Sequence, residues 1–170
     1  SRGSVIPVFI DNLMNGNTIC ITDPDATRFI IEIPDAVRLV MEATEVAQGG
    51  DLFILKMKAF RLGDLLDVIL DACRERGIIR GRVDIKQTGL IAGEKLHEDL
   101  ISPTEAGALY DLGDKYVILR SDDRCSMYPG VARADLSRYT SADVSLISTS
   151  DLKEMVMRYI NNIKEGRGHF

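Results

Sequence analysis

Two stretches carry most of the information in this chain. They are residues 22–29, Thr-Asp-Pro-Asp-Ala-Thr-Arg-Phe, and residues 93–98, Gly-Glu-Lys-Leu-His-Glu. In the first, Asp-Pro-Asp predicts a turn, because Pro fixes φ and Asp side chains accept hydrogen bonds from the nearby backbone. Arg28 follows this turn, where its guanidinium is suited to hold a diphosphate. The alternative is an ion pair with a neighbouring acid, which would be Asp23, Asp25 or Glu32.

The second stretch places a carboxylate directly after a glycine. Glu94 follows Gly93, and Leu96 and Leu100 have helical spacing, so a helix is predicted to begin here. A carboxylate at a helix start accepts hydrogen bonds either from ribose hydroxyls or from the amides of its own helix. His97 lies in the same stretch, and histidine is a residue type that can act directly on a ligand. A lone histidine in such a helix is more often structural.

The composition argues against several classes of function. The 170-residue chain has a net charge of −5, which disfavours non-specific nucleic-acid binding. There is no apolar run long enough to span a membrane and no secretory leader pattern. Cys20, Cys73 and Cys125 lie far apart and only two histidines are present, so no metal site is expected. Reduced thiols and a cytoplasmic location are the natural interpretation.

Hydrophobic spacing predicts a mixed order of helices and strands. Helices are expected over residues 7–14, 34–48 and 61–73, and from near Ser150 to residue 163. Strands are expected over residues 18–22, 52–57, 83–88 and 115–119. Residues 164–170 are expected to form a frayed tail. This order is typical of an α/β or α+β fold.

The run Leu-Phe-Ile-Leu at residues 52–55 is apolar throughout and lies between turn signals. Such a run predicts a strand buried on both faces, as in a parallel sheet. A strand of that kind needs neighbours on both edges, and this chain offers few of them.

The common motifs of cofactor binding and catalysis are missing from the sequence. There is no Gly-x-Gly-x-x-Gly after a predicted strand, no P-loop and no Gly-x-Ser-x-Gly. No tyrosine is followed four residues later by lysine, so a Tyr-x-x-x-Lys acid/base pair is absent. The N-terminal residues lead into a predicted helix start, where backbone N–H groups and the helix dipole favour a phosphate. An arginine in that position is more often simply solvated.

Three motifs, taken in order, resemble the inverting UDP-N-acetylglucosamine 4,6-dehydratases. These enzymes belong to the capsular-polysaccharide-biosynthesis branch of the extended short-chain dehydrogenases/reductases. The motifs are residues 1–7, Ser-Arg-Gly-Ser-Val-Ile-Pro, together with residues 22–29 and 93–98. The similarity continues through residues 49–55 and 139–141 and covers essentially the whole chain.

The resemblance implies an α/β fold and only part of an enzyme. Residues 1–163 would be the C-terminal, UDP-sugar-binding part, with residues 52–55 as an outer strand of a Rossmann sheet whose domain is missing. In such enzymes that N-terminal domain binds NADP and carries the catalytic residues. No catalytic residue, metal or cofactor is therefore expected on this chain alone. Its open strand edge would pair with a second copy, giving a homo-oligomer or a domain-swapped dimer.

The resemblance also implies a UDP-sugar site. Arg28 would hold the diphosphate and Glu94 the ribose, while the strand around Thr18 and Ile19 would lie along the uracil. The nucleotide-sugar would also contact a run of residues at the N-terminus, which are Arg2, Gly3, Ser4, Val5, Ile6 and Pro7.

One departure from the family pattern concerns this site. The family has Arg-Pro before Gly-Glu-Lys, whereas this chain has Ile91 and Ala92. The missing arginine normally helps to hold the nucleotide phosphates. Arg82 and Lys86 are candidates to replace it.

These features predict the UDP-sugar-binding portion of a 4,6-dehydratase that acts on UDP-N-acetylglucosamine in surface polysaccharide biosynthesis. The parent enzyme would be an NADP-dependent lyase, and the isolated chain would be inactive. One alternative is a UDP-sugar C4 or C5 epimerase of the same superfamily. Another is a stand-alone binding or assembly module without catalysis.

Overall fold

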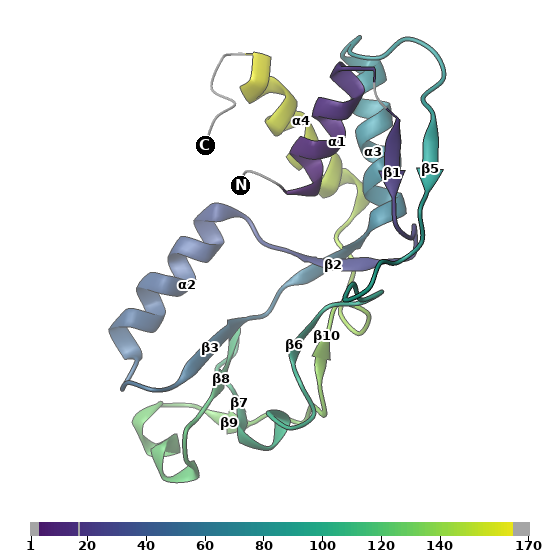
Figure 1. Cartoon of the computed structure of the whole chain (residues 1–170). Coiled ribbons are helices and arrows are strands. Elements are labelled where there is room, and N and C mark those ends of the chain that lie inside the picture. The colour runs from purple at the N-terminus through teal and green to yellow at the C-terminus, as the bar shows by residue number, and fades with distance from the viewer. Residues whose placement is uncertain (1–3, 17, 165–170) are drawn as a thin grey trace. The chain divides into compact units, whose positions relative to one another are not determined.

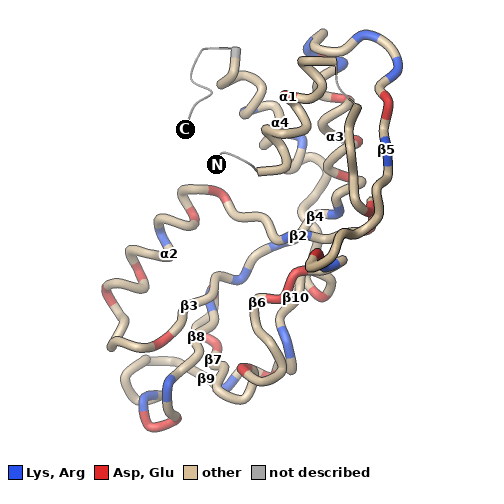
Figure 2. Tube along the Cα trace, in the orientation of Figure 1, with Lys and Arg blue, Asp and Glu red and all other residues tan. Residues whose placement is uncertain are grey.

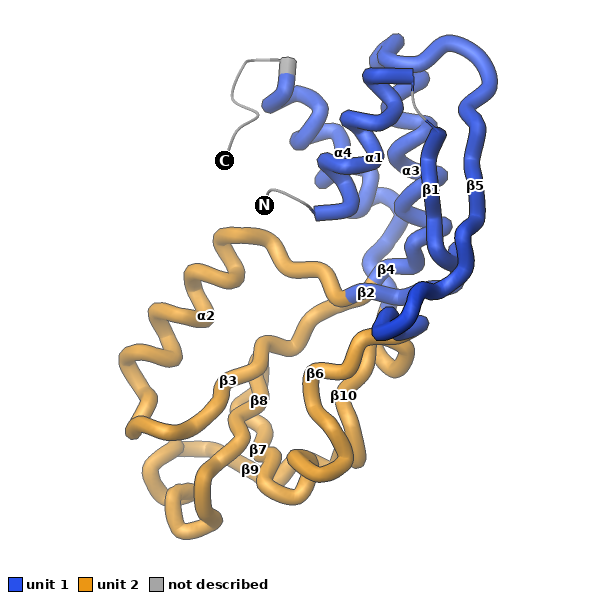
Figure 3. The backbone as a smooth tube through the Cα atoms, viewed as in Figure 1, with its two compact units in different colours: residues 1–28, 60–96, 146–170 blue, residues 29–59, 97–145 orange. Residues whose placement is uncertain are grey.

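The computed structural model describes residues 4–16 and 18–164 (Figure 1). The chain divides into two compact units, coloured separately in Figure 3. Unit 1 comprises residues 1–28, 60–96 and 146–170, and unit 2 comprises residues 29–59 and 97–145. Each unit is therefore assembled from segments that are far apart in the sequence.

Unit 1 combines three helices with a pair of parallel strands. The helices are α1 (Val5–Met14), α3 (Leu62–Glu75) and α4 (Thr149–Lys164), and the strands are β1 (Ile19–Ile21) and β5 (Ile85–Gln87). α3 packs against both α1 and α4. Buried side chains recur every three or four positions on these helices, as expected for amphipathic helices around one core. They include Phe9, Ile10, Leu13, Leu65, Ile69, Leu152, Val156 and Ile160.

Unit 2 contains a helix and a four-stranded antiparallel sheet. The helix is α2 (Ile33–Val46). The sheet has the order β3-β8-β7-β9, formed by Leu52–Leu55, Lys115–Ile118, Leu109–Asp111 and Ala132–Arg133. In the antiparallel pairing of β3 with β8, Phe53 lies opposite Val117. β3 therefore stands at one end of this sheet.

Shorter elements complete unit 2. β6 (Asp99–Ile101) pairs antiparallel with β10 (Tyr139–Thr140). The 3-10 helices η1 (Ala106–Ala108) and η2 (Asp122–Met127) flank the β7–β8 hairpin in the chain. β2 (Thr27–Ile30) and β4 (Lys58–Arg61) form a two-stranded sheet, and each passes from one unit into the other.

Tyr139 lies at the centre of the core of unit 2. Its ring centroid is 5.2 Å from that of Phe29 and 5.3 Å from that of Tyr116. Its hydroxyl accepts from the N–H of Met57 at 2.7 Å and donates to the Met57 carbonyl at 3.1 Å. The phenol thus fills the core while its polar end satisfies the backbone that follows β3. A cluster of buried residues surrounds it, formed by Ile54, Ile101 and Leu109.

The predicted helices and several predicted strands are confirmed. α1, α2, α3 and α4 lie where hydrophobic spacing placed them, within two residues at each end. The predicted strands over residues 18–22, 83–88 and 115–119 appear as the shorter β1, β5 and β8. The expected fold class is also confirmed, since helices and strands alternate along the chain in a mixed α/β order.

Two predictions about local structure are wrong. β3 is not a parallel strand buried on both faces, because it pairs antiparallel with β8 and Leu52 is 53% exposed. Only Ile54 of β3 is fully in the core. No helix begins at Glu94 either, since residues 92 and 93 form a turn and the next strand is β6. The four-residue spacing of Leu96 and Leu100 fits two repeats of a strand as well as one turn of a helix.

Three further observations concern only residues 4–16 and 18–164. No helix there has the length and apolar character needed to cross a bilayer. No three metal-ligating side chains lie together in this part of the chain. The thiols of Cys20, Cys73 and Cys125 are unpaired, and burial raises the pKa of Cys73. Figure 2 shows acidic and basic residues interspersed along the trace of each unit.

Candidate functional site

The Asp-Pro-Asp sequence forms the predicted turn between β1 and β2. The N–H of Asp25 donates to Oδ1 of Asp23 at 2.8 Å, and the N–H of Ala26 donates to the Asp23 carbonyl at 3.2 Å. The aspartate side chain thus holds its own turn, as Asx turns do.

This turn also completes the N-terminus of α3. The first N–H groups of a helix have no partner within the helix. Here the Leu62 N–H donates to the Ala26 carbonyl and the Gly63 N–H to the Pro24 carbonyl, both at 2.9 Å. A Cβ atom on Gly63 would lie 3.1 Å from the Pro24 oxygen, so this close approach favours glycine. These N–H groups at the start of α3 are therefore already hydrogen-bonded to carbonyls of the turn.

Arg28 and Glu94, both expected at the site, are in direct contact. Nη2 of Arg28 lies 3.1 Å from Oε1 of Glu94, and both side chains are about one-fifth exposed. Nη1 of Arg28 donates to the carbonyls of Thr27 at 2.8 Å and Leu96 at 3.1 Å. The neighbouring acids considered from the sequence do not include this partner, which lies 66 residues further along the chain. The guanidinium is thereby fixed in orientation.

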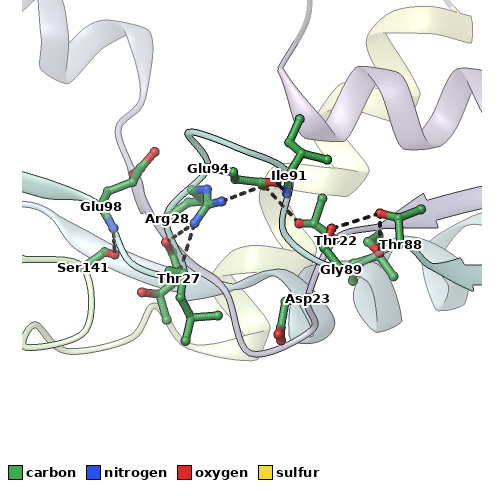
Figure 4. A network of polar contacts seen from close by, with 12 residues as sticks. Thr22, Asp23, Thr27, Arg28, Thr88, Gly89, Ile91, Glu94, Glu98 and Ser141 are labelled. Atoms are coloured by element: carbon green, nitrogen blue, oxygen red, sulfur yellow. Dashed lines mark hydrogen bonds and ion pairs between the residues drawn. The ribbon is translucent and has the colours of Figure 1, made fainter.

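Glu94 is held from three directions (Figure 4). Besides Arg28, the Thr22 hydroxyl donates to Oε1 at 3.0 Å, and the Ile91 N–H lies 3.5 Å from Oε2. The Glu94 N–H in turn donates to the Ile91 carbonyl at 3.0 Å. Gly93 has φ +88°, which favours glycine in this turn. Thr22 was not singled out from the sequence, although it begins the first motif.

The pair can bind a ligand that has an anion next to hydroxyl groups. The Arg28 guanidinium favours an anionic oxygen, and the Glu94 carboxylate accepts hydrogen bonds from hydroxyls. Because the two charges compensate each other, the pair can stay partly buried without a ligand. Because both side chains are partly exposed, a ligand can still reach them.

Thr18 and Ile19 lie at β1. Ile19 is fully buried, backbone included, and its N–H donates to the Asp84 carbonyl at 3.0 Å. The Thr18 hydroxyl lies 3.4 Å from Oδ2 of Asp84. Thr18 also lines a cavity of ≈ 410 Å³ together with Arg80 and Arg82. A base lying along this strand stays a prediction.

The N-terminal site residues fall at the start of α1. Ser4 is the N-cap residue with φ −72° and ψ 156°, and its side chain makes no capping hydrogen bond. No acidic residue stands in the first turn of α1. Val5, Ile6 and Pro7 form this turn. The predicted contacts of Arg2 and Gly3 lie outside the described residues.

The substituted position beside the pair is exposed. Ile91 is 68% exposed. Lys86 lies in β5 opposite Cys20, and Arg82 lines the cavity at Thr18. The structure gives neither of these cations a contact with the Arg28–Glu94 pair.

The remaining motif residues hold unit 2 together. The Phe29 N–H donates to Oε2 of Glu98 at 2.9 Å. The Glu98 N–H donates to the Ser141 hydroxyl at 2.8 Å, and the Ser141 N–H donates back to the Glu98 carbonyl at 2.9 Å. Glu98 and Ser141 were not considered as site residues, and their role here is to satisfy backbone groups.

The fold and this arrangement define the class of protein. The chain has a mixed α/β fold that matches part of an extended short-chain dehydrogenase/reductase. It resembles the X-ray structure of Pen from Bacillus thuringiensis, with a TM-score of 0.75 and 31% sequence identity. The likeness covers 93% of this chain and 45% of that one.

The chain belongs to the polysaccharide biosynthesis protein family, whose model matches residues 1–120. It is 33% identical over 171 residues to a UDP-glucose 4-epimerase of Rickettsia canadensis, covering 97% of this chain and 48% of that protein. It is 39% identical over 106 residues to the capsular polysaccharide biosynthesis protein CapD of Staphylococcus aureus, covering 62% and 17%. An uncharacterized membrane protein of Methanocaldococcus jannaschii is 40% identical over 119 residues, covering 69% and 36%. The chain thus spans half or less of the length of these relatives.

Proposed function

We propose that this chain is the UDP-sugar-binding portion of a nucleotide-sugar 4,6-dehydratase. The enzyme would act on UDP-N-acetylglucosamine in surface polysaccharide biosynthesis, and this portion alone would not be catalytic. The observation that carries the proposal is the contact between Arg28 and Glu94, two residues that come from separate motifs. Family membership supports the role in polysaccharide biosynthesis.

In this proposal each member of the pair has its own task. Arg28 donates to the diphosphate of the nucleotide, and Glu94 accepts hydrogen bonds from the ribose hydroxyls. The carbonyls of Thr27 and Leu96 hold the guanidinium, so it loses little freedom when the nucleotide binds. Thr22 plays the same part for Glu94. A hydrogen bond to a charged group contributes about 1.5–3 kcal/mol.

The NADP expected for the parent enzyme does not fit the described residues. A dinucleotide needs a glycine-rich turn that leads from a parallel strand into a helix N-terminus. The parallel strand β1 leads instead into the Asp23 turn and β2, and the helix start beside that turn is used by its carbonyls. In this proposal NADP therefore binds a part of the enzyme outside the described residues.

A second candidate function is a UDP-sugar epimerase. The specific observation in its favour is that the Rickettsia relative, named as a UDP-glucose 4-epimerase, covers 97% of this chain. Product analysis separates the two, because an epimerase inverts a hydroxyl-bearing carbon whereas a dehydratase releases water. Both functions place the same UDP contacts on Arg28 and Glu94.

Calorimetric titration with UDP tests the site. Arg28→Ala should raise the dissociation constant for UDP about 10-fold or more, because a charged hydrogen bond is lost. Arg74→Ala is the matched control, since Arg74 is a half-exposed arginine paired with Asp71 on α3. It should leave UDP affinity unchanged. If Arg28→Ala lowers only the melting temperature, Arg28 is a structural ion-pair residue and the proposal fails.

A further inference from the structure

The loop that joins α3 to β5 carries a local excess of positive charge. Within residues 76–86 Asp84 is the single acid. The basic residues of this segment are Arg76, Arg80, Arg82 and Lys86. Figure 2 shows basic residues along the loop where it leads into β5. Because the whole chain has a net charge of −5, this segment departs from the average charge of the protein and favours an anionic partner.

The loop is held at both of its ends. At the end of α3 the Ile78 N–H donates to the Cys73 carbonyl at 2.9 Å. At the start of β5 the Asp84 carbonyl accepts from the Ile19 N–H at 3.0 Å, which ties the loop to β1. Gly81, between the two central arginines, has φ +112°, a value that favours glycine. The backbone that carries these arginines is therefore fixed by the fold of unit 1.

Arg80 and Arg82 line the cavity at Thr18, called here the loop cavity. Its volume of ≈ 410 Å³ is typical of a small-molecule site. Within residues 4–16 and 18–164, neither arginine side chain has a hydrogen bond or an ion pair. The other charged residue on the described wall is Asp84, whose carboxylate lies 3.4 Å from the Thr18 hydroxyl. Two guanidiniums against one carboxylate leave the loop cavity positive, which favours an anionic oxygen.

The rest of the wall of the loop cavity is mostly apolar. Leu13 and Met14 contribute from the end of α1, and Ile78, Ile79 and Val83 contribute from the loop. A small ion alone would leave these side chains without a contact. The wall therefore suits a ligand that joins an anionic group to an apolar body.

The Arg28–Glu94 pair does not account for the loop cavity. Thr18 precedes β1 and Thr22 follows it, so about 13 Å of extended chain separates their Cα atoms. In the proposed binding mode UDP has its anion at Arg28 and its uncharged base along β1. Two cations at the start of β1 would thus have no anionic partner in UDP.

We propose that the loop cavity binds a phosphate monoester with an apolar body. The guanidiniums of Arg80 and Arg82 donate to the phosphate oxygens, and the apolar wall contacts the body of the ester. This site goes beyond the proposed UDP site and does not depend on it.

Calorimetric titrations with phenyl phosphate and with inorganic phosphate test the proposal. Phenyl phosphate should bind about 10-fold more tightly than inorganic phosphate, because only the ester has an apolar body. Arg80→Ala and Arg82→Ala should each raise its dissociation constant about 10-fold. Arg38→Ala is the matched control, since Arg38 is an exposed arginine on α2, and it should leave the affinity unchanged. Circular dichroism checks that all three variants keep their helices.

Amide NMR spectra of the unmodified chain separate the loop cavity from the UDP site. Phenyl phosphate should shift the N–H signals of Gly16 and Gly81, which line the cavity, whereas UDP should shift that of Gly93, next to Glu94. If UDP does not bind but phenyl phosphate still shifts Gly81, the proposed UDP site fails and the loop cavity stands.

Four results would overturn the proposal for the loop cavity. They are no binding of phenyl phosphate, equal affinity for phenyl and inorganic phosphate, an affinity that both arginine replacements leave unchanged, and a shift at Gly93 without one at Gly81.

Discussion

At the scale of single residues, the same motif side chains that would recognise a ligand also hold the protein together. Arg28 binds two backbone carbonyls as well as Glu94, and Glu94 binds Thr22. Loss of either side chain therefore affects both stability and binding, so experiments must separate the two. Neighbouring positions with little structural role are more informative.

Ile91→Arg is such a change. The side chain of Ile91 is mostly exposed, and its backbone N–H faces Glu94. An added guanidinium should tighten UDP binding about 10-fold, because the resemblance implies an arginine on the nucleotide phosphates at this position. Titration with UDP measures the effect. Ile91→Gln, which adds length without charge, should give no such gain, and an equal gain from both would contradict the account.

Gly63→Ala should destabilise unit 1. The new methyl group would lie 3.1 Å from the Pro24 carbonyl, against which the start of α3 packs. We expect the free energy of unfolding to fall by about 1–3 kcal/mol, because the contact is with a backbone oxygen, which cannot move aside as a flexible side chain can. Urea denaturation measures it. Gly107→Ala is the control because no atom lies within 4 Å of its Cβ position, and it should be close to neutral.

At the scale of elements, a buried carboxylate joins η2 to the start of β3. Oδ2 of Asp51 accepts from the Tyr128 hydroxyl at 2.6 Å and from Nη2 of Arg124 at 2.8 Å. The Asp51 side chain is fully buried. Burial raises its pKa, but the hydrogen bonds from Arg124, Tyr128 and the Arg120 N–H outweigh burial, so the pKa lies below its usual 3.8.

This lowered pKa predicts a loss of stability in acid. Because Asp51 binds a proton less readily in the folded state, its contribution is fully present above about pH 4 and declines as the pH falls through 3.8 and below. Asp51→Asn should cost about 2 kcal/mol at pH 7 and less at pH 3. Urea denaturation at both pH values measures the difference. An equal cost at both would show that the carboxylate charge does not contribute.

Elements with local signals could be predicted from the sequence, and elements defined by distant partners could not. The helices α1, α3 and α4 follow from an apolar residue every three or four positions. β9 and β10 have two residues each, too few to show an alternating pattern, and their partners are β7 and β6. The pairing of β3 could not be predicted either, because an apolar run does not reveal whether the neighbouring strand is parallel or antiparallel.

At the scale of the whole molecule, the sequence named candidate site residues but could not show their contacts. Arg28 and Glu94 were named from two motifs, yet their ion pair depends on the turn that brings residue 94 back to β2. The division into two units depends on which distant segments pack together, which periodicity cannot show.

The central claim is that unit 1 binds a UDP-sugar through its diphosphate. Parallel calorimetric titrations of the unmodified chain with UDP-N-acetylglucosamine and with uridine test it most directly. We predict that the UDP-sugar binds at least about 10-fold more tightly than uridine, because only it carries the anion that Arg28 contacts. Equal affinity for the two ligands, or no binding of the UDP-sugar, would contradict the account.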